Sequence, residues 1–289
     1  MSNARVFLLT ALAMTAFAGN SLLCRMALRD TAIDAASFTS IRLLSGALVL
    51  WLMARFFAGP QADKGNWLSA FALFAYAACF SFAYLSLSAA TGALLLFGAV
   101  QASMIGYGIW VGERLSRRQL LGLVSAFGGL LSLFLPGLSA PPLFGALLML
   151  VAGVAWGGYS LLGKKAGSPI KVSAGNFSRS VLLAALLSAV MVVFMPDTHH
   201  FDSLGVIYAV ASGALASGAG YALWYSVLPS LRATHAATVQ LSVPVITAIG
   251  GVVFLSEDLT LRLVLASIAI LGGIALVILK GHSETTITR

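Results

Sequence analysis

Ten apolar stretches, each of about twenty residues, follow one another along the chain. An α-helix of this length crosses the roughly 30 Å hydrocarbon layer of a membrane. The stretches are apolar on every side, as in LLAALLSAVMVVFM, whereas the strands of a membrane barrel alternate apolar and polar residues. The sequence therefore predicts an all-α integral membrane protein. The predicted helices span residues 5–25, 36–56, 67–87, 90–112, 118–136, 142–163, 173–195, 203–227, 233–255 and 259–280.

Composition excludes a soluble chain. Only 9% of the 289 residues are charged and 60% are hydrophobic, whereas soluble domains contain about 25% charged residues. Cys24 and Cys79 both fall inside apolar stretches, so we interpret them as small core residues rather than as a disulfide or metal pair.

The net charge of +8 has a membrane explanation. With the N-terminus inside, twelve Lys and Arg residues fall on the inner side and three on the outer side, as is typical of cytoplasmic loops. The loops LPGLSAPP and MPDTHHFD on the outer side contain no Lys or Arg. We therefore expect a bacterial inner membrane protein with cytoplasmic termini, and no nucleic-acid partner.

An internal repeat divides the chain into residues 1–139 and 140–289. The segment AFAGNSLLCRMA (16–27) matches AWGGYSLLGKKA (155–166) at six of twelve positions, at an offset of 139. At an offset of 144, GERLSRRQLLGLVSAFGG (112–129) aligns with SEDLTLRLVLASIAILGG (256–273). Five helices per half is an odd number, so the second half must enter the membrane with the opposite orientation. Inverted repeats of this kind are common in transporters, in which alternating access exposes a midplane site to each side.

The ten short helices, the duplicated five-helix unit and the paired E-x-L…GG endings resemble the drug/metabolite transporter superfamily, in its EamA-type branch. Within that branch the chain is most similar to YddG-type aromatic amino acid exporters. The resemblance implies a monomeric basket of helices around a central cavity, with the fifth and tenth helices at the periphery. It also implies export of amino acids and related compounds from the bacterial cytoplasm.

Aromatic residues recur at helical spacing on several predicted helices. Such residues either line a cavity for a planar or apolar side chain or form the belt at the membrane interface. We assign Trp51, Trp67, Trp110 and Tyr208 to the belt because they lie near helix ends. The offsets pair Phe17 with Trp156, Asn20 with Tyr159, and Phe80 with Trp224. The candidate cavity residues are Phe17, Tyr76, Phe80, Tyr84, Trp156, Tyr159, Tyr221 and Trp224.

Polar residues in the middle of a span are usually functional or paired. Asn20, Gln101 and Gln240 are candidates, because an amide can bind an amino or a carboxylate group without carrying a charge. The alternative is an interhelical hydrogen bond. Pro244 interrupts the ninth helix and frees a carbonyl for a ligand or a neighbouring helix.

Charged residues inside the bundle are few. Arg42, toward the outside, and Arg179, toward the inside, either attract a carboxylate and act as gates or snorkel to the interface. No Asp or Glu falls in the middle of a helix, which favours a facilitator or exchanger and makes a cationic cargo less suitable. The repeat mates Glu113 and Glu257 are interpreted as capping or pairing residues near Arg118 and Arg262.

Other function classes find little support in the sequence. An intramembrane lipid-acting enzyme would need a nucleophile–base pair or a metal cluster at membrane depth, and neither H-E-x-x-H nor G-x-S-x-G is present. His199 and His200 lack defined metal-ligand spacing. We predict a transporter of small metabolites with no cofactor and no metal. Its cargo is an aromatic or other apolar amino acid, or alternatively a drug or another metabolite.

Overall fold

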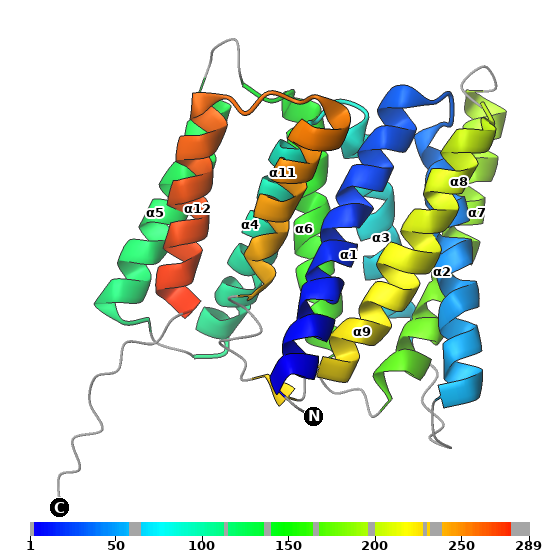
Figure 1. The fold of residues 1–289 in the computed structure, drawn as a ribbon, viewed down its shortest axis with the longest axis horizontal. Coiled ribbons are helices and arrows are strands. Elements are labelled where there is room, and N and C mark those ends of the chain that lie inside the picture. Colours follow the sequence, from blue (N-terminus) through cyan, green and yellow to red (C-terminus); the bar gives the residue numbers. More distant parts are fainter. Residues whose placement is uncertain are drawn as a thin grey trace, which may run out of the picture.

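The computed structural model describes residues 3–57, 65–112, 115–135, 140–163, 168–195, 200–227, 230–231 and 239–278. Over these ranges the chain contains ten helices and no strand (Figure 1). Segments α8, η2 and α9 follow one another without a break and count as one helix. The elements are α1 (Asn3–Asp30), α2 (Ala35–Phe57), α3 (Trp67–Tyr84), α4 (Ala89–Trp110), α5 (Arg117–Phe134), α6 (Leu143–Gly163), α7 (Pro169–Phe194), α8 (Ser203–Ala211), η2 (Ser212–Ala219), α9 (Gly220–Val227), α11 (Ser242–Leu255) and α12 (Leu261–Ile278).

Each of the ten predicted helices is present, and local chemistry explains where several of them begin. Asn66 and Ser88 accept hydrogen bonds from backbone amides in the first turns of α3 and α4, and Ser116 forms a capping box with Gln119 at the start of α5. Helix α7 begins earlier than predicted, at Pro169, because proline is compatible with the first turn. Side chains thus fix the starts of these helices.

Eight helices are long and apolar enough to cross a membrane by length and composition: α1, α2, α3, α4, α6, α7, the α8–η2–α9 helix and α12. Helix α11 is apolar but has only 14 described residues. Large apolar side chains are exposed on the outside of the bundle, including Phe194 and Val193 on α7 and Ile268 on α12. An apolar exterior of this kind fits a surface that faces lipid.

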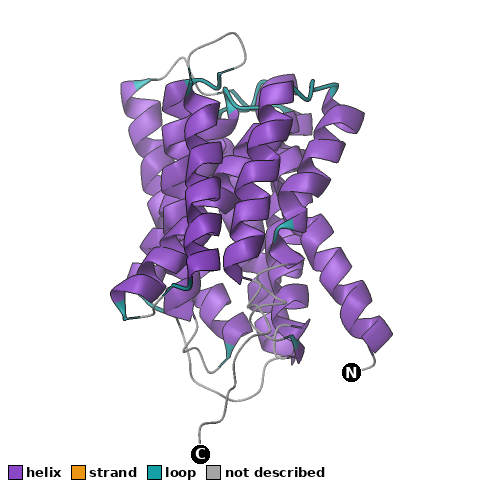
Figure 2. Ribbon diagram, turned by 90° about the vertical axis from the view of Figure 1, so that its left-hand side faces the viewer, coloured by secondary structure: helices purple, strands orange, loops and turns teal. Residues whose placement is uncertain are grey.

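The helices run between two opposite faces of the bundle, and the loops that join them lie at these faces (Figures 1 and 2). We call the face that contains the start of α1 the terminal face and the opposite one the far face. All acidic residues in the described ranges lie near the far face: Asp30, Asp34, Asp202, Glu257 and Asp258. Basic residues near the terminal face are Arg5, Arg55, Arg117, Arg118 and Lys171. The described residues therefore keep the charge asymmetry on which the predicted orientation rests.

The most extensive packing joins α5 with α12, α3 with α6, α2 with α7, and α4 with α6. The α5–α12 pair forms one edge of the bundle (Figure 1). Its backbones approach closely, because a Cβ added at Gly122 would meet the carbonyl of Gly273 and one at Gly129 would meet Ala269 and Ile270. Gly128 and Gly272 face open space. Only the second glycine of each predicted Gly–Gly pair therefore contributes to this packing.

Candidate functional site

A connected network of nine aromatic rings occupies the interior of the bundle. Tyr76 links α3 to α6, with its ring centroid 4.9 Å from that of Trp156. Trp156 in turn lies 5.2 Å from Tyr221, and Tyr221 lies 5.9 Å from Phe17 on α1. The network consists of Phe17, Tyr76, Phe80, Tyr84, Trp156, Tyr159, Phe177, Tyr221 and Trp224. The structure thus brings together all eight aromatic residues predicted for a cavity and adds Phe177.

Helical periodicity puts these rings on the inward faces of their helices. Tyr76, Phe80 and Tyr84 follow one another at intervals of four residues, so they form one stripe along α3. Tyr221 and Trp224 are three residues apart on α9 and are both buried. The belt candidates behave differently, because Trp51, Trp67 and Trp110 are 55%, 57% and 85% exposed. The three belt tryptophans are therefore exposed, whereas Tyr208, the fourth belt candidate, is half-buried and packs against the core.

Asn20 joins three helices beside the ring network. Its Nδ2 donates to the phenol oxygen of Tyr76 on α3 at 3.1 Å. Its Oδ1 accepts a 2.6 Å hydrogen bond from the hydroxyl of Ser212, the first residue of η2. Asn20 is ten residues from the far end of α1, which is about 15 Å at 1.5 Å per residue. Both readings of Asn20, a cargo ligand and an interhelical bridge, fit this position.

The η2 segment is a π-helix inside a span, a form of backbone that is often found at functional sites. The backbones of η2 and α2 lie almost in contact, with little side chain between them. A Cβ at Gly213 would meet Ser45 and the backbone carbonyl of Arg42, and one at Gly46 would lie 3.1 Å from the carbonyl of Gly213. Glycine is therefore required where the two helices approach, next to Asn20 and Arg42.

Arg42 lies inside the bundle and does not snorkel to the interface. It is only 2% exposed, and it is seven residues, or about 10 Å, from the far-face start of α2. Its guanidinium carbon lies 5.1 Å from the ring centroid of Tyr76 and 4.8 Å from that of Phe80. Its Nε and Nη1 are buried without a hydrogen-bond partner. The side chain thus joins the ring network as a cation.

The other polar candidates lie apart from these rings. Arg179 donates to the carbonyl of Gly175 and lies over the exposed ring of Trp67, toward the terminal face. Gln101 is buried in α4 and Gln240 is half-buried, but neither shares a described hydrogen bond with the network. Pro244 falls in the first turn of α11, directly after a break at Leu241. A turn at Leu241 therefore precedes the helix that contains Pro244, whereas residues 232–238 lie outside the described ranges.

A polar cluster joins four helices at the far face. The Nε of Arg25 on α1 lies 3.2 Å from Oε1 of Glu257, which follows α11. The other oxygen of Glu257 accepts from the backbone amide of Ala89 at the start of α4, and Arg25 donates to the carbonyl of Tyr84 at the end of α3. Glu257 thus caps a helix, one of the two roles predicted for it, and its ion-pair partner is Arg25. Glu113 lies outside the described residues.

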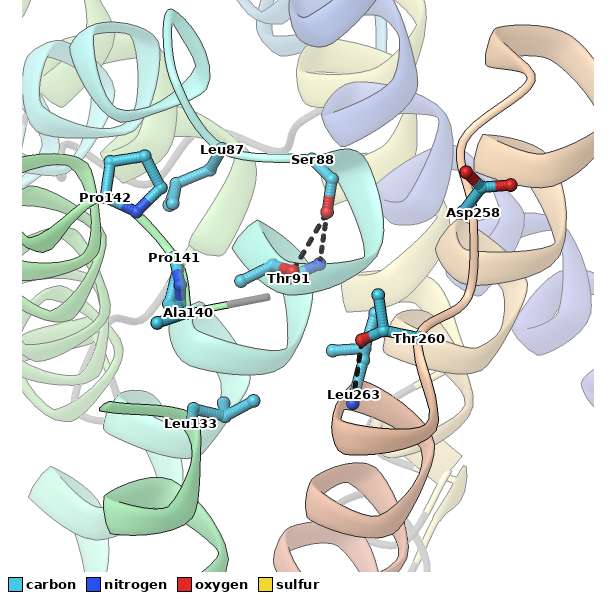
Figure 3. Close-up of a pocket in the computed structure, with 10 residues that line it drawn as sticks. All are labelled: Leu87, Ser88, Thr91, Leu133, Ala140, Pro141, Pro142, Asp258, Thr260 and Leu263. Carbon is cyan, nitrogen blue, oxygen red and sulfur yellow. Dashed lines mark hydrogen bonds between the residues drawn. The ribbon is translucent and has the colours of Figure 1, made fainter. Parts of the chain in front are cut away.

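A pocket of about 230 Å³ opens at the far face (Figure 3), and none of the nine rings lines it. Two of its polar side chains already serve as helix caps. The hydroxyl of Ser88 accepts from the amide of Thr91, and that of Thr260 accepts from the amide of Leu263. None of the predicted cargo residues lines this pocket, so we do not place the cargo there. The lining residues are Leu87, Ser88, Thr91, Leu133, Ala140, Pro141, Pro142, Asp258, Thr260 and Leu263.

Sequence reasoning missed Ser212, Phe177 and Arg25, as well as the pairing of Arg25 with Glu257. Ser212 lies in the glycine-rich segment ASGALASGAG, whose small residues gave a signal for close helix approach but not for a π-helix. Phe177 matched Phe38 at the repeat offset, yet only the fold puts its ring beside Tyr221. Arg25 and Glu257 are 232 positions apart. A pairing over that distance has no local pattern from which it could be inferred.

Comparison with known proteins finds a family match over the second half of the chain. The model of the EamA-like transporter family matches residues 143–279. "Uncharacterized protein PA1977" of Pseudomonas aeruginosa is 56% identical over 96% of each chain. An "Uncharacterized transporter" of Archaeoglobus fulgidus is 27% identical over 97% of this chain and 99% of its own length. The "Uncharacterized transporter YoaV" of Bacillus subtilis is 26% identical over 56% of this chain and 57% of its own.

A solved structure has the same fold. A protein of known crystal structure superposes with a TM-score of 0.65 and 20% sequence identity, covering 96% of this chain and 98% of that one. At that identity the likeness concerns the fold alone. Together with the apolar helices, the family match and the names of the relatives support a multi-pass membrane transporter. Over residues 143–279, nearly half of its length, the chain is similar to the EamA-like transporter family.

Proposed function

We propose that this transporter exports small metabolites, above all aromatic and other apolar amino acids, by alternating access. One observation carries the proposal: nine rings from α1, α3, α6, α7 and α9 meet inside the bundle, beside the amide of Asn20 and the guanidinium of Arg42. Aromatic walls with a few polar groups are suited to an amphipathic cargo with a planar side chain. YddG-type exporters carry cargo of this kind, which is why we propose the same specificity.

The proposed cargo contacts are the aromatic candidates together with Asn20 and Arg42. Asn20 is suited to either end of an amino acid, because its amide both donates and accepts. Gln101, Arg179 and Gln240 are proposed as further contacts along the path, outside the ring network. Arg179 lies nearer the terminal face, where a cation can attract a carboxylate that enters from that side.

Two inverted repeats of five helices, residues 1–139 and 140–289, are proposed as the moving parts. The pattern of helix contacts supports them, because exchanging the halves maps the most extensive contacts onto one another. Contacts α2–α7, α4–α11 and α5–α12 each map onto themselves, while α4–α6 maps onto α1–α11. The contacts α3–α6 correspond to those of α1 with the α8–η2–α9 helix. This symmetry is what a transporter that rocks one half against the other requires.

The conformation supports access from the terminal face. Arg25 and Glu257 connect α1, α3 and α4 of the first half with the end of α11 of the second half, at the far face. Opening the far face requires these contacts to break. With the terminal face assigned to the cytoplasm of a bacterial inner membrane, this is the state that receives cargo for export. We propose that the protein works as a monomer.

A different cargo, either a drug or another metabolite, is the second candidate. The buried Arg42 and the lack of any described acid in the middle of a helix argue against a cationic drug. They leave neutral and anionic metabolites as the competing cargo.

Transport by purified protein in proteoliposomes tests the proposal. We expect saturable counterflow of labelled tryptophan and phenylalanine, compared with threonine, without the need for a proton gradient. Trp156→Ala and Asn20→Ala should lower this flux at least tenfold. Trp110→Ala, which removes an 85% exposed ring outside the network, should leave it unchanged. Absence of amino acid flux in folded protein would overturn the proposed cargo while leaving the family assignment intact.

A further inference from the structure

Arg42 is the charged group of the described interior for which the fold supplies no counter-ion. The two described ion pairs, Arg25–Glu257 and Arg29–Asp30, do not include it. Nε and Nη1 of Arg42 are sealed from solvent and donate to no protein atom. A buried cation without a hydrogen-bonded partner costs several kcal/mol, so such groups are retained where they bind something.

The surroundings of Arg42 orient it without neutralising it. Tyr76 and Phe80 present their rings to the guanidinium at 5.1 and 4.8 Å, which holds a cation through the negative face of each ring. Ring contacts leave the in-plane N–H groups unused, and these are the groups that a carboxylate binds through two parallel hydrogen bonds. Arg42 is therefore arranged as an anion receptor beside an aromatic wall.

In the described ranges, the same region lacks an anionic partner for an ammonium group. Every acidic side chain in the described ranges lies near the far face, and three of these already have roles there. Asp34 accepts from the first-turn amides of α2, Asp30 pairs with Arg29, and Glu257 pairs with Arg25. Beside the rings, Oδ1 of Asn20 and the phenol oxygen of Tyr76 offer neutral acceptors that already receive a hydrogen bond.

We infer that the site recognises its cargo by a carboxylate bound at Arg42 and does not require an α-amino group. Aromatic monocarboxylates without an amine are then ligands as good as the corresponding amino acids, and aromatic amines without a carboxylate are not. The inference rests on the proposed function, because it names the chemical group by which the same site holds its cargo.

Three indole compounds separate the two ends of the cargo: tryptophan, indole-3-propionate, which lacks the amine, and tryptamine, which lacks the carboxylate. In proteoliposomes, indole-3-propionate should inhibit labelled tryptophan counterflow as strongly as unlabelled tryptophan does. Tryptamine should need at least a tenfold higher concentration. The Arg42→Gln variant should lose at least tenfold in affinity for indole-3-propionate, and Arg42→Lys should lose less. Arg55→Gln, at the exposed terminal end of the same helix, serves as the matched control.

Direct binding, measured as the ligand-induced rise in melting temperature of detergent-solubilised protein, keeps the inference separate from the proposed function. If the protein does not transport labelled tryptophan, the proposal of an amino acid cargo is rejected. Stabilisation by indole-3-propionate that requires Arg42 would still support the carboxylate site. Equal stabilisation by tryptamine, or undiminished binding of indole-3-propionate to Arg42→Gln, overturns the inference. Without ligand, Arg42→Met should melt no lower than the wild type, because it removes an unpaired buried charge. A clear fall would assign Arg42 a structural role instead.

Discussion

Arg25 and Glu257 lie 232 positions apart in the sequence, yet their side chains meet at 3.2 Å and are only 14% and 9% exposed. The second oxygen of Glu257 also receives the amide of Ala89. One carboxylate thus connects an arginine of α1 with the start of α4, from its position after α11.

Glu257→Gln should destabilise the far-face contact, since the charge that strengthens both hydrogen bonds is removed. We expect the free energy of unfolding to fall by about 2 kcal/mol, the range of a hydrogen bond to a charged group. Thermal melts of the solubilised protein measure this change. Asp30→Asn, which breaks the more exposed Arg29–Asp30 pair, is the matched comparison and should have an effect of less than about 1 kcal/mol. Equal effects of the two variants would contradict a special role for Glu257.

Ser212 and Asn20 should be coupled energetically. Removing the 2.6 Å hydrogen bond by Ser212→Ala leaves Oδ1 of Asn20 unpaired inside the bundle. We expect a loss of about 1–3 kcal/mol in stability, typical of an unsatisfied buried polar group. A double-mutant cycle with Asn20→Ala should then give a coupling energy of at least about 0.5 kcal/mol. Strict additivity would show that the two side chains do not interact in the membrane.

Gly213→Ala should disrupt the approach of η2 to α2. The added methyl group would collide with the Ser45 hydroxyl and with the carbonyl of Arg42, and the carbonyl cannot move without shifting α2. We expect both a lower melting temperature and loss of transport, because Arg42 and Asn20 lie at this contact. Gly128→Ala adds the same methyl group where nothing lies within 4 Å, and its melt and flux should match the wild type.

Gly273→Ala should weaken the packing of α12 against α5, because a Cβ there would meet Ala126 and the backbone of Gly122. These helices form an edge of the bundle and carry none of the nine rings of the network. Stability should therefore fall while the substrate concentration for half-maximal transport stays the same. Gly272→Ala, one residue away in open space, is the control. A change in apparent affinity without a change in stability would contradict this peripheral role.

The fold could be predicted to a large extent because a membrane leaves so few options for the backbone. The apolar stretches gave all ten helices, and the stripe of Tyr76, Phe80 and Tyr84 followed from a spacing of four residues. The resemblance to EamA-type transporters is confirmed by the family model and the relatives. The inverted repeat, the cargo and the amino acid exporter specificity stay predictions.

The contacts between helices could not be derived in the same way. Helical spacing says which face of α1 carries Asn20, but not that Tyr76 and Ser212 are its partners, because the rotation and tilt of each helix depend on all its neighbours. Gly213 illustrates the same limit. Its sequence context indicates close packing, and only the fold shows that α2 at Arg42 is what it packs against.

The π-helical backbone of η2 gives the eighth span a property that a regular α-helix lacks. A π turn holds more residues than the 3.6 of an α turn, so tightening η2 toward α geometry lengthens the segment and twists the next one about the helix axis. Helix α9 continues directly from η2 and carries the rings of Tyr221 and Trp224. A small change of winding in the eight residues of η2 can thus change the direction of the Tyr221 and Trp224 side chains, while α8, the far-face half of the same helix, keeps its position.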